Sequence, residues 1–161
     1  MHIAILWQQE QGGGVDSHLL SLLRSWPNKE DNFTIIFNIG NGGYYRIEAD
    51  LFPMSNVKSV QYRSYAYASL ANEVNSVVVS KLIKYMGYLL LPITVNIIMK
   101  LKLKNILIDI GDVDAVIANN GGYPAAWGTL SALPAAKRAK IPVRILLVHH
   151  SATRPGAMMS I

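Results

Sequence analysis

The chain has no cysteine and little charge, and both deficits exclude classes of function. Without cysteine it can form no disulfide framework, no thiolate metal site and no cysteine nucleophile, and it fits a reducing compartment such as the cytoplasm. Charged residues make up 16% of its 161 residues and hydrophobic ones 51%, which excludes an intrinsically disordered chain. The length predicts a single domain over residues 1–161 with a sizeable core.

Long apolar runs are also missing. The uncharged stretch from Tyr85 to Met99 falls short of the roughly 18 to 20 residues that a membrane-spanning helix needs, and Pro92 interrupts it. We expect two helices there, or one helix broken at Leu91, in the core or at an interface. The apolar N-terminus is only one strand long and follows no basic region, so no secretory signal is predicted. These features predict a cytoplasmic protein.

The positive charge is concentrated in one part of the chain. The net charge is +5, and the clustered lysines are Lys81, Lys84, Lys100, Lys102 and Lys104. Such a cluster is either a solvated face or a patch that attracts acidic lipid, phosphorylated sugar or nucleic acid. Aromatic residues do not alternate with basic ones as they do in nucleic-acid platforms, so no nucleic-acid partner is predicted. Peripheral contact with the inner face of a membrane is one interpretation of the patch.

Apolar runs of strand length recur along the chain. Residues 2–7 and 33–38 are short runs bounded by polar residues and glycines, and a further candidate strand begins at Val57. Residues 112–120 and 141–156 each contain an apolar strand that leads into polar residues. Continuous rather than alternating apolar runs are typical of parallel strands that are buried on both faces.

Helical periodicity appears between these strands. From Asp16 onward, leucines at spacings of three and four predict a helix that Asp16 or Ser17 caps and that Pro27 ends. The Ala- and Leu-rich residues 122–140 predict another helix, which Pro134 interrupts or restarts. The order of elements predicts an α/β fold, a Rossmann-like parallel sheet with helices on both faces. Ligands bind such sheets beyond the carboxyl ends of the strands, where the polar residues of this chain converge.

Three consecutive glycines separate the first strand from the first helix. Gly12, Gly13 and Gly14 can form a tight turn without a ligand, or can expose backbone N–H groups that hold a phosphate at the helix N-terminus. A turn with positive φ explains one or two glycines, so three favour the close approach of a ligand. Ser17 replaces the last glycine of a dinucleotide fingerprint, and Asn38 replaces its acidic ribose ligand. No Lys-Ser/Thr pair of a P-loop follows either, so we predict no cofactor.

Histidines follow the last apolar run. His149 and His150 are neighbours, and neighbours on a strand point to opposite faces, so at most one of them faces the crevice. His2 and His18 stand alone in the sequence, and no third ligand has a convincing spacing, so no metal site is predicted. Arg154 is close enough to His149 to reach an anion in the same crevice, and the alternative is a solvated loop arginine.

Two asparagines end the preceding apolar run. Asn119 and Asn120 come directly before Gly121 and Gly122, which indicates a tight turn at the strand end. Asparagine tolerates left-handed backbone conformations, so a purely structural role is the favoured interpretation. A hydrogen bond from one of these amides to a sugar hydroxyl is the alternative.

Three segments, in this order, resemble the first domain of family 4 glycosyltransferases. HIAILWQQEQGGGVDSHLLSLL resembles their opening strand, glycine loop and leucine-patterned helix. DVDAVIANNGGYP is similar to a later strand with its loop, and AAKRAKIPVRILLVHHSATRPG is similar to the segment that leads through another strand to a histidine. The resemblance covers both ends of the chain well and the middle, from about Gly40 to Gly111, poorly.

The resemblance implies a GT-B architecture, in which two Rossmann-like domains face each other across a cleft. A sugar then passes, with retention of anomeric configuration, from a nucleotide-sugar donor to a sugar or lipid-linked acceptor. His149 matches the family histidine that positions the donor sugar, so the resemblance implies a catalytic role for it. Gly13 and Gly14 match the loop that borders the donor phosphates and the acceptor. The implied substrate-binding residues are Gly12, Gly13, Gly14, Asn119, Asn120, Ser151 and Arg154.

The family's donor-binding second domain has no counterpart before the sequence ends at Ile161. Half a cleft leaves the transition state without its opposing groups, so we expect the chain to be inactive until a C-terminal domain or a partner subunit joins it. An alternative from another class is a non-enzymatic Rossmann-like module that uses residues 85–99 and the lysines to bind a membrane surface or a partner chain. A nucleotide- or flavin-binding single domain is a weaker third option.

Overall fold

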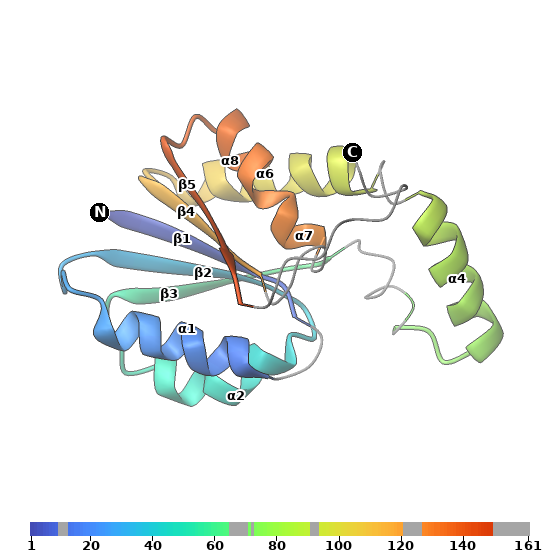
Figure 1. Ribbon diagram of the computed structural model, residues 1–161, viewed down its shortest axis with the longest axis horizontal. Coiled ribbons are helices and arrows are strands. Elements are labelled where there is room, and N and C mark those ends of the chain that lie inside the picture. The colour runs from blue at the N-terminus through green and yellow to red at the C-terminus, as the bar shows by residue number, and fades with distance from the viewer. Residues whose placement is uncertain (10–12, 65–70, 72, 91–93, 121–126, 150–161) are drawn as a thin grey trace.

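The computed structural model describes residues 1–9, 13–64, 71, 73–90, 94–120 and 127–149. Five parallel strands form one sheet in the order β3-β2-β1-β4-β5 (Figure 1). The strands are β1 (His2–Trp7), β2 (Asn32–Asn38), β3 (Val57–Tyr62), β4 (Ala115–Asn120) and β5 (Val143–Val148). Helices flank this sheet on both faces, so the predicted Rossmann-like α/β class is confirmed.

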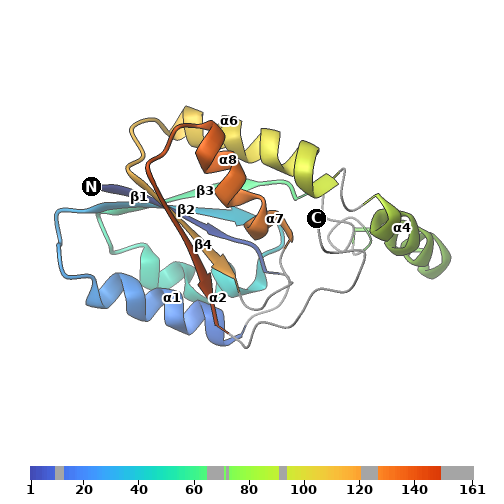
Figure 2. The same ribbon diagram turned by 45° about the horizontal axis from the view of Figure 1, so that its top comes forward.

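Two layers of helices cover the sheet (Figure 1). On one face α1 (Gly14–Ser25) and α2 (Gly42–Leu51) lie side by side. On the other face lie α6 (Lys100–Ile110), α7 (Trp127–Leu130) and α8 (Ala132–Arg138), and a π-helical segment, η1 (Thr94–Met99), leads into α6. A further helix, α4 (Val77–Leu89), stands apart from the sheet, beyond the carboxyl ends of the strands (Figures 1 and 2).

The side chains of β1 alternate between two separate cores. Ile5 packs in one cluster with Leu19 of α1 and Ile47 of α2, whereas the next residue, Leu6, packs with Leu103 of α6 on the opposite face. None of these five side chains is more than 6% exposed. The central strand is therefore buried on both faces, as its unbroken apolar run predicts.

The starts of two helices differ from the prediction. α1 begins at Gly14 rather than at Asp16, because Gly13 is the N-cap and the Asp16 carboxylate lies inside the first turn, where it accepts a hydrogen bond from Gly13 N–H. Its end at Ser25, before Pro27, agrees with the prediction. α2 was not predicted, because the glycines around Asn41 indicate a turn. The Asn41 side chain accepts a hydrogen bond from Tyr44 N and so starts a helix there.

The interruptions of the later helices follow the two prolines. α4 ends at Leu89 and helical structure resumes at Thr94, so the expected pair of helices is present, while residues 91–93 lie outside the described part of the chain. Pro134 lies in the first turn of α8, where its missing N–H breaks no helical hydrogen bond, so it restarts the helix. Within the described residues, no helix has the length and apolar character to cross a membrane.

The last two strands are shorter than the apolar runs that predicted them. β4 begins at Ala115, because Gly111 and Asp112 turn the chain with positive φ values of 71° and 22°. β5 ends at Val148, so His149 follows the strand rather than belonging to it. Both strands therefore place their polar ends at the carboxyl edge of the sheet, as predicted.

A buried carboxylate ties the first two strands together at the opposite edge. Asp31 accepts hydrogen bonds from the α-amino group of Met1 at 2.6 Å, from Trp26 Nε1 at 2.8 Å and from Asn28 Nδ2 at 3.0 Å. These donors, the α-amino group first, lower the pKa of Asp31 below its ordinary value of 3.8, and the same contact raises the pKa of the α-amino group above 8.0.

We predict that Asp31→Asn removes a pH-dependent part of the stability. A lowered carboxyl pKa contributes stability that is present above 3.8 and is lost as the pH falls through the folded-state value. The raised pKa of the α-amino group contributes stability that is complete below 8.0 and is lost at higher pH. Thermal denaturation from pH 3 to pH 9 should show the largest loss in the variant between these limits.

The matched control is Asp50→Asn, which breaks the exposed ion pair between Asp50 and Arg24. Exposed pairs contribute little, so this variant should follow the wild type across the pH range. Equal losses in the two variants, or a loss in Asp31→Asn that does not change with pH, would contradict the assignment.

Candidate functional site

The order of the strands places the topological switch point of the sheet between β1 and β4, and we call the region beyond the carboxyl ends of these two strands the crevice. From β1 the chain proceeds through β2 to β3 on one side, and β4 and β5 lie on the other side. The connections that leave β1 and β4 therefore run in opposite directions, which is the usual ligand position in a parallel sheet. Trp7, the last residue of β1, pairs in register with Asn119 of β4. The polar residues at these ends are the candidates for the site.

Gly13 and Gly14 border this crevice with backbone conformations that any residue can adopt. Gly13 has an extended φ of −174°, and among the described glycines only Gly40 and Gly111 have positive φ. A Cβ on Gly14 would meet no atom within 4 Å, and one on Gly13 would lie 3.6 Å from Gln9 Nε2. Neither a positive-φ turn nor tight packing explains these two glycines. The open space beside Gly14 favours the approach of a ligand.

The N-terminus of α1 is less suited to a phosphate than predicted. Gly13 N–H donates a hydrogen bond to Asp16 Oδ1 at 3.1 Å, and Arg46 Nη1 lies 3.3 Å from Asp16 Oδ2. The buried carboxylate occupies this N–H and places negative charge at the end of the helix dipole that attracts anions. The prediction of an unoccupied amide is wrong for Gly13. The geometry suits a neutral hydroxyl group better than a phosphate.

Asn119 and His149 form the polar centre of the crevice on the α1 side. The Asn119 side chain is buried, and its Oδ1 lies 2.6 Å from His149 Nε2. An amide oxygen can only accept a hydrogen bond, so this contact is a hydrogen bond in the tautomer of His149 that has its proton on Nε2. Asn119 Nδ2 is buried without a hydrogen-bond partner among the described residues. A buried amide donor of this kind is costly unless it meets an acceptor, and a ligand oxygen is one.

The expectation of a tight turn at Asn119 and Asn120 is wrong for these two residues. Both are buried residues of β4, and the left-handed conformations among the described non-glycine residues are at Asp112 and Lys140. Asn120 O accepts a hydrogen bond from His149 N at 3.2 Å, which continues the pairing of β4 with β5. The asparagines therefore extend the sheet and do not turn the chain.

His18 is the site residue that the sequence analysis missed. Its ring, on α1, meets the ring of His149 edge to face, with the centroids 4.4 Å apart and the planes at 66°. The interpretation of His18 as an isolated histidine is therefore wrong. The available signal was its position one helical turn after Gly14, on the helix that follows the glycine loop, but only the packing of α1 against the sheet brings it to His149.

Gln8 lines the other side of the crevice, toward α7. Its backbone N–H donates to Thr129 Oγ1 at 3.3 Å and its Nε2 donates to Ser64 Oγ at 3.2 Å. Its buried Oε1 has no hydrogen-bond partner among the described residues. A Cβ on Gly128 would overlap the Gln8 side chain, so this glycine makes room for it. Close packing thus fixes Gln8 where β1 ends.

Asn38 lies where a dinucleotide-binding domain has its acidic ribose ligand, but it hydrogen-bonds the connection that follows β1. Its Oδ1 accepts hydrogen bonds from Gln9 N at 3.0 Å and from Asn41 Nδ2 at 3.2 Å. Asn41 Nδ2 also donates to Trp7 O at 3.1 Å, so two buried amides link the ends of β1 and β2. The residue that occupies the place of an acidic ribose ligand thus has a structural role.

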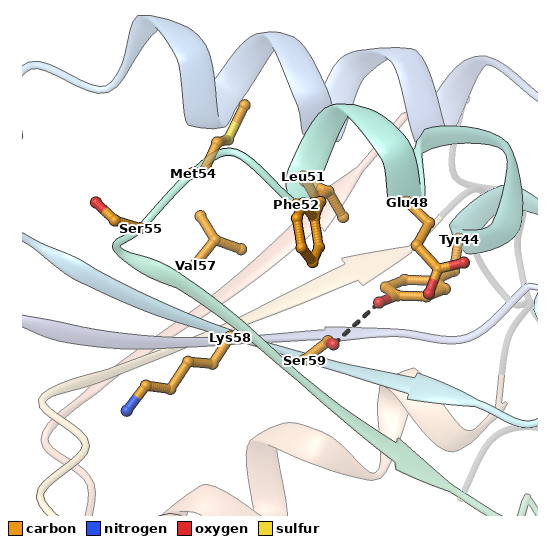
Figure 3. Close-up of a pocket in the computed structure, with 9 residues that line it drawn as sticks. All are labelled: Tyr44, Glu48, Leu51, Phe52, Met54, Ser55, Val57, Lys58 and Ser59. Carbon is orange, nitrogen blue, oxygen red and sulfur yellow. Dashed lines mark hydrogen bonds between the residues drawn. The ribbon is translucent and has the colours of Figure 1, made fainter.

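A separate hollow of about 410 Å³ lies between α2 and β3 (Figure 3). It is lined by Tyr44, Glu48, Leu51, Phe52, Met54, Ser55, Val57, Lys58 and Ser59. The Tyr44 hydroxyl donates to Ser59 Oγ at 2.9 Å, and Lys58 extends away from Glu48, so the charged groups do not converge. The hollow lies at the start of β3, on the edge of the sheet away from the carboxyl end, and we do not assign it to the site.

The remaining sequence-predicted residues, Gly12, Ser151 and Arg154, lie outside the described part of the chain, as does His150. Within the described part, no group of three or more His, Asp or Glu side chains could hold a metal ion. The crevice instead gathers side-chain amides and imidazoles, which exchange hydrogen bonds with hydroxyl groups. A comparison with known proteins finds no family model and no curated protein that matches this chain.

We predict that Gly14→Ala is tolerated and that Gly43→Ala is not. Alanine at Gly14 has open space and loses less backbone entropy on folding, so it should leave stability unchanged or raise it by about 0.4–1 kcal/mol. A Cβ on Gly43 would lie 2.5 Å from Trp7 Cζ2, which should cost about 1–3 kcal/mol of overpacking. Urea denaturation measures both values. A similar loss in the two variants would show that the space beside Gly14 is already filled.

Proposed function

We propose that this chain forms the acceptor-side, N-terminal half of a retaining GT-B glycosyltransferase related to family 4. The observation that carries the proposal is the contact between His18 and His149, which joins the two segments with the family resemblance. Gly13 and Gly14 lie at the start of α1, and His149 follows β5. In such an enzyme both segments lie on one wall of the crevice. The distance of 4.4 Å between the ring centroids of His18 and His149 supports this arrangement.

The chemistry of the crevice also supports a sugar substrate. Asn119 Nδ2 and Gln8 Oε1 offer a donor and an acceptor that are buried and unpaired within the described residues. Sugar hydroxyls both donate and accept hydrogen bonds, so they can satisfy both kinds of group. Because the Asp16 carboxylate occupies the nearby helix end, we assign the sugar rather than the phosphates of a donor to this wall.

His149 is the proposed catalytic residue because it would touch the sugar at the reacting centre. Asn119 fixes one ring nitrogen and His18 fixes the position of the ring, so the imidazole is oriented before a ligand arrives. Orientation of this kind lowers the entropic cost of bringing the reacting groups together. The donor phosphates and the developing charge would be held by the opposing domain or partner subunit, and we place the reaction in the cytoplasm.

We predict that the chain alone has no appreciable transferase activity. One wall can bind a sugar, but it cannot supply the opposing groups that stabilise the transition state. The measurement incubates the purified chain with radiolabelled UDP-N-acetylglucosamine and farnesyl phosphate and follows labelled lipid and free sugar. Turnover above that of His149→Ala would overturn the view of the chain as half of an enzyme.

We predict weak binding of UDP-N-acetylglucosamine to the crevice, measured by NMR titration of the isotope-labelled chain. The largest shifts should fall on the backbone amides of Gly13, Gly14 and His149 and on the side-chain amide of Asn119. His149→Ala should bind about five- to tenfold more weakly, the effect of one lost hydrogen bond. The control is His2→Ala. His2 lies at the start of β1, and its imidazole contacts Thr34 Oγ1 of β2. Equal affinities of the two variants would contradict the proposed site.

A further inference from the structure

The helix α4 exposes an apolar stripe. Val78, Leu82, Tyr85 and Leu89 recur at spacings of four, three and four residues, which places them on one helical face. Their exposed fractions are 76%, 57%, 67% and 46%. A surface helix normally turns such a stripe toward the core, because burial of apolar surface stabilises the fold. Here the stripe faces solvent.

The opposite side of α4 is its less exposed side. Ser80, Ile83 and Gly87 are half-buried, and their spacing of three and four residues defines a single face. This face contains a hydroxyl and a glycine and only one large apolar side chain. A helix of this length is marginal in water without packing of its apolar face. We therefore expect the stripe on α4 to pack against a surface that the described residues do not provide.

The charge around the stripe has one sign. Residues 74–108 contain the clustered lysines and no aspartate, glutamate or arginine. Lys81 and Lys84 are exposed, and helical geometry places Lys81 directly beside Val78 and Tyr85. Apolar residues flanked by lysines are typical of helices that lie in the plane of a bilayer, where the lysines attract anionic headgroups. A second copy of α4 would instead bring lysines of the same charge together.

The segment that follows α4 in the chain continues this character. Ile97 and Ile98 of η1 and Leu101 of α6 are 53%, 42% and 43% exposed. Both ribbon views place α4 beyond the start of α6 and beyond the carboxyl ends of the strands (Figures 1 and 2). A flat surface in contact with α4 would thus lie on the side of the molecule where the crevice is located.

We propose that α4 docks the chain on an anionic lipid bilayer, with its stripe of Val78, Leu82, Tyr85 and Leu89 in the interface and Lys81 and Lys84 at the headgroups. Docking itself is independent of the proposed function. The further step, that the acceptor reaches the crevice from the bilayer, rests on that function. Vesicle binding and the sugar titration therefore succeed or fail separately.

The test is sedimentation of the full chain with phosphatidylcholine vesicles, with and without phosphatidylglycerol. The wild type should bind only the anionic vesicles. Val78→Ser/Leu82→Ser/Tyr85→Ser should lower the vesicle affinity about tenfold or more through lost apolar burial. Lys81→Gln/Lys84→Gln should lower it by about tenfold or more at low salt and much less at high salt. Hydrogen exchange should show protection of α4 amides on the vesicles.

Matched controls distinguish docking through α4 from nonspecific adsorption to the vesicles. Phe52→Ser removes an apolar side chain that is 92% exposed on another part of the surface, and Lys58→Gln/Lys137→Gln removes exposed lysines outside α4. Both control variants should bind like the wild type, and all variants should keep the wild-type melting temperature. Equal loss in the controls, or no binding by the wild type, would overturn the proposal. A dimer that the serine variant dissociates would show that a second copy covers the stripe.

Discussion

The parallel pairing of β1 with β4 is the contact on which the site depends, because it joins the beginning of the chain to a segment far along the sequence. Trp7 and Asn119 lie side by side through this pairing, and β4 in turn places β5 beside it. Burial of β1 between two helical layers stabilises the pairing, since apolar side chains leave water on both faces. Without it the glycine loop and His149 would share no wall.

At the carboxyl ends of the strands the side chains change from apolar to polar, and the polar side chains line the crevice. The interiors of β1 and β4 are apolar, whereas Gln8, Asn38 and Asn119 are buried amides at or beside the strand ends. Buried amides are tolerable where hydrogen bonds satisfy them, and most of these groups bond to neighbouring connections. The exceptions are a donor, Asn119 Nδ2, and an acceptor, Gln8 Oε1, which lie on the two sides of the crevice. Selectivity there would rest on hydrogen-bond direction rather than on charge.

Sequence patterns predicted the sheet better than they predicted the site. The strand runs and the helix after the glycines are continuous local signals, so the fold class and the converging strand ends followed from them. α2 was missed because its N-cap, Asn41, lies among glycines that also indicate a turn. His18 was missed because its partner is distant in sequence, and the role of Asp16 depends on the exact start of α1. Contacts between layers carry no periodic signal, so the residues that orient His149 became visible only in the folded chain.

The distribution of charge separates two tasks in this molecule. A chain with only 16% charged residues has few charges to place, and two of its lysines, Lys81 and Lys84, flank the apolar stripe of α4. Beside the crevice, the buried Asp16 carboxylate accepts a hydrogen bond from Gly13 N–H and pairs with Arg46. Attraction to an anionic surface would thus act through α4, which stands apart from the sheet, and not through the hydrogen bonds beside β1 and β4. Location and recognition can then change independently of each other.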